Sequence, residues 1–156
     1  IQLAANPKAN PEREKPAPGD VRLLISRNPD GQVWAVVLRP VVKGFKDERI
    51  KLESPTGHEF FDVIERTERV KLQDLKKIKG GFAVTVVVPR DLIGLPKLEP
   101  GDAVRMDVGY IFGDKGGTNA AVRAYWHNNS FTANVVNDVP HESRLEPHEW
   151  GDVLVE

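Results

Sequence analysis

The sequence predicts an all-β protein, an antiparallel β-sandwich. Short stretches of alternating apolar and polar residues recur along the chain, and clusters of Gly, Pro, Asn and Asp that favour turns separate them. No stretch longer than about two turns has helical periodicity. At 156 residues the chain is long enough for one domain with a substantial core and too short for two ordinary domains.

The first 19 residues combine the end of a strand with an exposed loop. Ile1 and Leu3 alternate with Gln2 before an Asn-Pro pair stops the pattern. Residues 7–19 contain four prolines among charged and polar residues, a composition that cannot bury enough apolar surface to fold alone. We therefore divide the chain into a strand remnant and proline-rich loop over residues 1–19 and a β-sandwich over residues 20–156.

The next segments predict a hairpin and two weaker strands. Alternation begins at Asp20 and leads to a turn over residues 28–31. Residues 32–39 are apolar on both faces, as expected of a strand that is covered on both sides, and Pro40 ends them. Residues 59–65 and 70–72 are weaker strand candidates.

The second half of the chain predicts a buried strand, one helical turn, another hairpin and a closing strand. Residues 82–88 are rich in β-branched side chains, which predicts the buried strand. Residues 89–95 have room for one helical turn, with Asp91 as a cap and Gly94 at its end. Residues 104–112 and 119–126 then flank a glycine-rich turn, and residues 150–155 form the last strand.

Composition excludes several classes of function. The chain has 22 basic and 23 acidic residues and a net charge of -1, so it lacks the basic surface that binds nucleic acid. No apolar run approaches the roughly 20 residues that cross a bilayer, and we expect no membrane insertion. Because there is no cysteine, the chain has no disulfide, thiolate metal site or cysteine nucleophile.

Motifs of catalysis are absent, and we expect no enzyme. The sequence contains no nucleophile elbow, phosphate-binding loop or dinucleotide-binding loop. His141 and Glu142 resemble the start of a zinc-protease motif, but Leu145 stands where the second histidine is needed.

Acidic residues are frequent in the last third of the chain, and three interpretations of their role are open. They could form a glycosidase pair, serve as solvated or turn-forming groups, or bind calcium, for which Asp107 and Asp114 at loop ends offer hard oxygen ligands. A glycosidase needs a deep cleft, for which a sandwich of this size has little room. The residues concerned are Asp107, Asp114, Asp138, Glu142, Glu146 and Glu149.

Two of the three tryptophans are candidates for binding a sugar. An indole face stacks on the apolar face of a sugar ring while neighbouring polar groups bond its hydroxyls. Trp126 and Trp150 stand beside such groups, whereas Trp34 belongs to an apolar strand and is expected in the core. Both candidates could equally be large core side chains. The polar residues that would complete the site are Arg123, Asn128, Asn129 and Asp138.

Five segments in order resemble the family 9 carbohydrate-binding modules and their relatives in the DOMON-like group of β-sandwiches. The segments are Val88-Pro-Arg-Asp-Leu-Ile-Gly-Leu95, Pro100-Gly-Asp-Ala-Val-Arg-Met-Asp-Val-Gly109, Arg123-Ala-Tyr-Trp126, Asn137-Asp-Val-Pro140 and Leu145-Glu-Pro-His-Glu-Trp-Gly151. The resemblance covers about the last seventy residues well and residues 20–40 more loosely.

This resemblance implies a jelly-roll-like sandwich that binds a glycan or oligosaccharide without catalysis. Such domains often carry structural calcium and are appended to larger extracytoplasmic bacterial proteins. Some relatives hold haem, for which Met106 and the four histidines are candidate ligands, but Met106 on an apolar strand is more simply a core residue. Domains of this family begin with several strands that are missing here, so we expect open sheet edges that another fragment or molecule covers.

The alternative function is a structural or interaction domain of a surface protein with no small-molecule ligand. Exposure of the two candidate indoles distinguishes the two functions. Two exposed indoles facing one cleft favour sugar binding, and two buried indoles favour the structural role.

Overall fold

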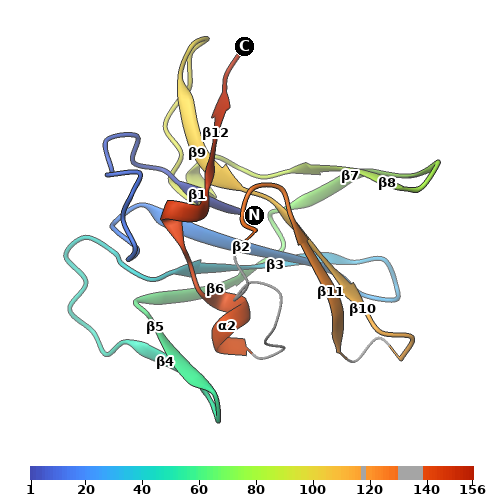
Figure 1. Ribbon diagram of the computed structural model, residues 1–156, viewed down its shortest axis with the longest axis horizontal. Helices are drawn as coiled ribbons and strands as arrows, with labels where there is room; N and C mark the ends of the chain where they lie inside the picture. Colours follow the sequence, from blue (N-terminus) through green and yellow to red (C-terminus); the bar gives the residue numbers. More distant parts are fainter. Residues whose placement is uncertain (117–118, 130–138) are drawn as a thin grey trace.

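The centre of the molecule is a six-stranded antiparallel sheet in the order β12-β9-β1-β2-β3-β6 (Figure 1). This computed structural model describes residues 1–116, 119–129 and 139–156. The strands of the sheet are β1 (Gln2–Ala4), β2 (Asp20–Arg27), β3 (Val33–Arg39), β6 (Val63–Thr67), β9 (Ala103–Asp107) and β12 (Gly151–Leu154).

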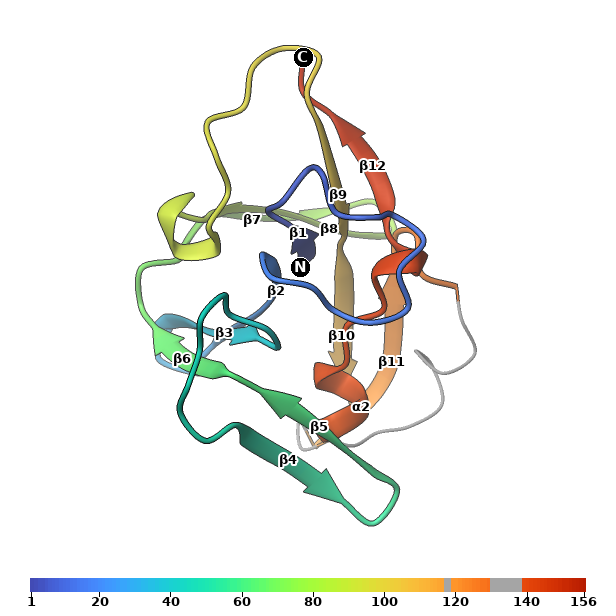
Figure 2. The ribbon, with the colours of Figure 1, turned by 90° about the vertical axis from the view of Figure 1, so that its left-hand side faces the viewer.

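Three hairpins and short helical segments surround the central sheet (Figure 2). The hairpins pair β4 (Ile50–Ser54) with β5 (Gly57–Phe61), β7 (Lys71–Ile78) with β8 (Gly81–Val87), and β10 (Gly109–Gly113) with β11 (Ala120–Tyr125). The helical segments are η1 (Asp91–Ile93), α2 (Val139–Ser143) and η2 (Pro147–Glu149). Helix α2 packs against β4 and β5. Within the described ranges, no helix has the length and apolar character needed to span a membrane.

Apolar residues cover both faces of the central sheet, which confirms the predicted all-β, sandwich-like fold. Because successive strand residues point to opposite faces, Leu23 and Val37 enter one core while Leu38 enters the other. The first core is made of Leu3, Ala5, Val21, Leu23, Ala35, Val37, Val70, Leu92 and Ile93. The second is made of Ala4, Leu38, Phe61, Leu145 and Trp150. Met106 packs against the first core, as a core residue would.

Strand β1 occupies the middle of the sheet although it has only three residues. It pairs with β2 along one edge and with β9 along the other, and all of its residues are buried. Residues 1–19 therefore contribute a central element of the sandwich as well as a loop on its surface.

Several segments differ from the sequence prediction in detail. Strand β4 was not predicted, and β5 and β6 are separate strands where one candidate was expected at residues 59–65. No residue of β8 is buried, although its composition predicts a buried strand. The hairpin of β7 and β8 extends away from the sheet and leaves most of β8 uncovered (Figure 1).

The predicted helical turn near residues 90–95 is confirmed as η1. Gly94 ends it in the left-handed conformation, with a φ of 67°. Asp91 does not cap the turn; its carboxylate instead pairs with Arg69 across 2.6 Å.

A buried carboxylate holds the proline-rich loop against the domain. Asp20 is 1% exposed and accepts hydrogen bonds from both Nε and Nη2 of Arg13 and from the backbone N–H of Ala17. The Arg13 guanidinium also lies 5.7 Å from the centre of the Trp150 ring. Arg13 thus connects the loop to the first residue of β2 and to the second core.

We predict that Arg13→Met destabilises the fold. The substitution keeps an apolar stem but leaves the Asp20 carboxylate buried without its charged partner, which costs about 3–5 kcal/mol. Urea denaturation followed by circular dichroism measures the change. Lys15→Met, at an exposed position in the same loop, is the matched control and is expected to change stability by less than about 0.5 kcal/mol. Equal effects of the two variants would contradict the assigned role of Arg13.

Candidate functional site

Trp126 presents an exposed indole at the end of β11. Its backbone N–H donates to the carbonyl of Val108 across 2.8 Å, and its side chain is 55% exposed. The ring lies against Gly151, the first residue of β12. A Cβ atom at position 151 would lie 2.9 Å from Cη2 and 3.0 Å from Cζ3 of this ring. Glycine at this position therefore lets the indole lie close to the backbone of β12.

His127 extends the aromatic surface beside Trp126. The two ring centres lie 5.8 Å apart with an interplanar angle of 64°, an edge contact. Nδ1 of His127 lies 2.8 Å from the carbonyl oxygen of Glu149, which fixes the imidazole next to the end of η2. We call Trp126, His127 and Gly151 the Trp126 platform.

Asp107 supports the platform from inside the protein. Its carboxylate is fully buried and accepts the backbone N–H groups of Val108, His127 and Asn128 across 2.9, 2.9 and 3.2 Å. These bonds fix the chain that follows Trp126 against the end of β9. Hydrogen bonds to a buried carboxylate are among the stronger ones in proteins, so the platform has a rigid base.

Asp107 and Asp114 are the two residues predicted to bind calcium. The carboxylate of Asp107 accepts hydrogen bonds from these three amides, and Asp114 is not part of the Trp126 platform. Asp114 follows β10 and accepts a hydrogen bond from Nδ2 of Asn119 across 3.0 Å. Strand β10 separates the two carboxylates. Across the described part of the chain, no three His, Cys, Asp or Glu side chains gather to form a metal-binding group. Calcium binding stays a prediction.

The two candidate indoles have different environments. Trp150 is 0% exposed and belongs to the second core, so neither of its ring faces is open to a ligand. The sequence allowed Trp150 to be either a core side chain or a ligand-binding residue, and the structure places it in the core. Trp34 is partly buried, and its indole N–H donates to Oδ1 of Asn28 across 2.8 Å. Among the three tryptophans, Trp126 is the most exposed.

The polar residues predicted for the site are divided between the surface and the interior. Asn129 is exposed beside the platform, and its Nδ2 donates to the His127 carbonyl across 3.1 Å. Asn128 is 5% exposed and donates to Glu146 across 3.2 Å. Arg123 points inward, where its guanidinium pairs with Glu142 across 3.2 Å. Asp138 lies outside the described residues, as does the side chain of His141.

Sequence reasoning did not include His127 and Gly151 in the site. His127 was visible as part of an aromatic run with Trp126, and this was the available signal. Nothing in the local sequence indicates that Gly151 meets Trp126, since 25 positions separate them (151 − 126).

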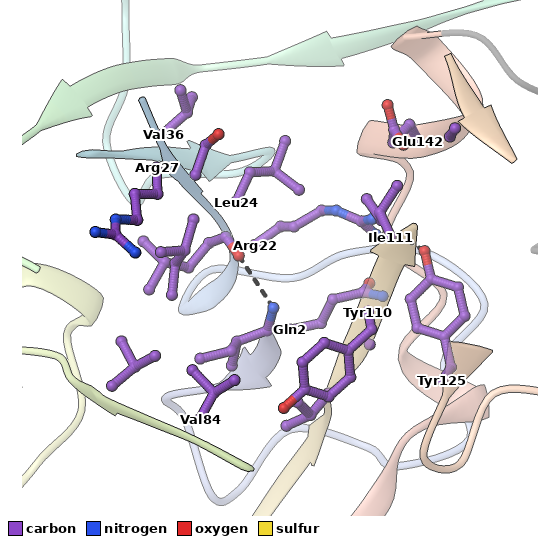
Figure 3. Close-up of a pocket in the computed structure, with 18 of the residues that line it drawn as sticks. Gln2, Arg22, Leu24, Arg27, Val36, Val84, Tyr110, Ile111, Tyr125 and Glu142 are labelled. Carbon is purple, nitrogen blue, oxygen red and sulfur yellow. Dashed lines mark hydrogen bonds between the residues drawn. The ribbon is translucent and has the colours of Figure 1, made fainter. Parts of the chain in front are cut away.

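A large hollow lies in front of the first residue of β1 (Figure 3). Its volume is about 960 Å³, and its walls come mainly from β2, β3 and β10, with smaller contributions from β8 and β11. Ile1 is among the residues that line it, and its amino group donates to the Leu23 carbonyl across 3.0 Å. The pKa of this group is lowered from 8.0 to about 5, mainly by burial and in part by the charge of Arg22, while Asp107 partly opposes the change.

Comparison with known proteins gives no relative. No family model, curated protein or solved structure matches the chain. The function is therefore inferred from the geometry described above.

We predict that the 156-residue chain becomes more stable as the pH rises from about 5 to 8. In this range the unfolded chain holds a proton on the Ile1 amine that the folded chain has released, so rising pH favours folding. Urea denaturation across the range measures the effect. The N-acetylated chain, whose other titrating groups are unchanged, is expected to lose this part of the pH dependence. Identical pH profiles for the two chains would refute the buried amine.

We predict that Gly151→Ala displaces the Trp126 ring. The new Cβ would lie only 2.7 Å from Cδ2 of His127 and 2.9 Å from Cη2 of Trp126, so both rings must move, at a cost of about 1–3 kcal/mol. A shift in the Trp126 indole N–H resonance and altered acrylamide quenching report the movement. Gly81→Ala is the matched control, because a Cβ there meets nothing within 4 Å. An unchanged Trp126 resonance in Gly151→Ala would disprove the packing.

Proposed function

We propose that this chain is a non-catalytic binding module that stacks a sugar ring on the open face of Trp126. The exposed, backbone-supported indole carries this proposal. A flat aromatic ring held rigidly at a surface matches the apolar face of a pyranose, and stacking on it buries that face without a deep pocket.

Polar groups beside the platform suit the edges of a sugar ring. The His127 imidazole and the Asn129 side-chain amide lie next to Trp126 and offer donors and acceptors to ring hydroxyls. Such a platform contacts one ring face only, so we expect dissociation constants on the order of millimolar for a single sugar. Glycan or oligosaccharide ligands that cover more of the surface should bind more tightly.

In this proposal the buried groups have a supporting role. Trp150 and Asn128 hold the core and the turn, and Asp107 fixes the backbone from which Trp126 projects. Their contribution to affinity is therefore indirect. The resemblance to carbohydrate-binding modules supports an extracytoplasmic location within a larger bacterial protein.

The second candidate function is a structural or interaction domain, and large exposed apolar side chains on two hairpins favour it. Extensive exposed apolar surface commonly marks a contact with another protein or protein segment. The side chains occur on β8, β10 and β11 and include Phe82, Val87, Tyr110, Ile111, Phe112 and Val122. The two functions occupy different surfaces, so a sugar titration tests the first without engaging the second.

We predict that Trp126→Ala weakens sugar binding. Titration with reducing disaccharides and longer oligosaccharides should change the tryptophan fluorescence and release heat in the parent chain. The variant should bind at least about tenfold more weakly, which corresponds to about 1.4 kcal/mol. Trp34→Phe is the control, since Trp34 lies in β3 away from the platform, and it should bind like the parent.

Two outcomes would count against sugar binding. The first is the absence of fluorescence and heat changes at tens of millimolar sugar in the parent chain. The second is an equal response in the parent and in Trp126→Ala, which would place any binding elsewhere on the molecule.

A further inference from the structure

The hollow in front of β1 lies where the central sheet has room for a further stretch of strand. Strand β1 pairs with β2 and with β9, and both of its neighbours continue past the point where it begins. Beyond Leu23, β2 runs on to Arg27, and β9 leads into β10 after Val108. Between these two continuing strands lies the hollow, lined by residues 24–27 on one side and by most of residues 109–113 on the other. We call this gap the β1 slot.

The pairing register defines which residues face each other across the β1 slot. Gln2 is opposite both Arg22 and Asp107, and each step back along β1 advances one residue on both neighbours. The first position before Ile1 therefore falls opposite Leu24 and Gly109. The second falls opposite Ile25 and Tyr110 on the same rule.

Backbone groups along β2 are directed into the β1 slot. Ile1 and Leu23 exchange two hydrogen bonds, from Ile1 N to Leu23 O at 3.0 Å and from Leu23 N to Ile1 O at 2.8 Å. In an antiparallel pair every second residue forms such a doubly bonded pair. Ile25 is the next one on β2, so its N–H and C=O face the β1 slot, and a strand there would pair with them.

Apolar side chains border the β1 slot on both faces of the sheet, together with charged groups that include Arg27 and Glu142. Leu24, Val36 and Ile111 lie on one side of the gap, while Val84 and Tyr110 lie on the other (Figure 3). A strand in this position would be covered on both faces, so it would carry apolar side chains at successive positions.

Two buried polar atoms in the wall of the hollow also lack partners. Gln2 Oε1 and Arg22 Nε have no hydrogen bond within the described chain, although both residues are 4% exposed. Leaving such groups unpaired is costly, and a segment of backbone in the hollow would supply both donors and acceptors.

From this geometry we propose that the β1 slot accepts an extended strand that continues β1 through the Ile1 nitrogen. Direction and register favour this occupant over a separate chain. The Ile1 N–H already points along the ladder at Leu23, so a strand joined to it needs no turn. An amide at Ile1 would also replace the buried amine, whose pKa falls to about 5, with an uncharged group.

The test compares two N-terminal fusions of the same length. The strand fusion places Thr-Thr-Val-Val-Val directly before Ile1, with valine at the three positions nearest the core. The control fusion is Thr-Pro-Val-Pro-Val, in which proline removes the N–H donors at the second and fourth positions before Ile1. Both fusions convert the Ile1 amine to an amide, so the loss of its charge cancels in the comparison.

The strand fusion is expected to melt at least about 5 °C above the proline fusion. Hydrogen exchange at the Ile25 amide should be at least about tenfold slower in the strand fusion, because that N–H gains a partner. Equal melting temperatures and equal Ile25 exchange in the two fusions would overturn the proposal.

A free peptide separates the continuous strand from a partner's strand. Acetyl-Thr-Thr-Val-Val-Val-amide, added in equimolar amount to the 156-residue chain, should leave Ile25 exchange unchanged, because it lacks the millimolar effective concentration that tethering provides. If the free peptide protects Ile25 as well as the fusion does, the β1 slot is a site for another chain and the continuous strand is rejected.

Discussion

The structure depends on the backbone pairing of β1 with two strands that are far apart in the sequence. On one side β1 bonds to β2, which leads into β3 and β6; on the other it bonds to β9, which pairs with β12. Three residues therefore connect the first and last parts of the chain into one sheet. Without them the two halves of the sheet would each present an unpaired edge. The two cores, which lie on opposite faces of the sheet, would also lose the strand that contributes a residue to each of them.

Buried carboxylates fix the loops that this sheet cannot hold by itself. Asp20 binds the proline-rich loop through Arg13, and Asp107 binds the turn after β11 through the backbone amides of His127 and Asn128. In both cases a charge is buried and accepts at least two hydrogen bonds from the loop that it fixes. Such groups stabilise one arrangement of the loops, because any other arrangement would take donors away from a buried carboxylate. The candidate binding surface depends on the second of these two anchors.

The sequence predicted those strands in which the pattern of apolar residues along the strand shows which of its faces are buried. Alternation located β2, and the apolar run of β3 correctly indicated cover on both faces. Strand β4 was missed because Ile50 and Leu52 are its only apolar residues, too few to distinguish it from a loop. The exposure of β8 could not be predicted, since β-branched residues favour a strand but do not determine what lies over it.

The site was predictable as a set of candidates but not as an arrangement. Local sequence gives Trp126 and Trp150 similar polar neighbours, and their opposite burial results from packing against distant segments. Trp150 packs with Leu38 and Phe61 in the second core, whereas Trp126 is 55% exposed and lies against Gly151 and His127. The inward direction of Arg123 likewise depends on Glu142, which lies in a different element.

The central position of β1 also constrains the order of events during biosynthesis. Gln2 pairs with Asp107, 105 residues later in the chain (107 − 2), so β1 leaves the ribosome long before one of its two neighbours exists. Until then it can form only a partial sheet with β2, β3 and β6, in which the edge of β1 stays open. Contacts of such long range slow folding, and unpaired edges promote association between chains. A nascent chain of this protein thus has a prolonged period of vulnerability, during which chaperones that shield exposed strands would have their greatest effect.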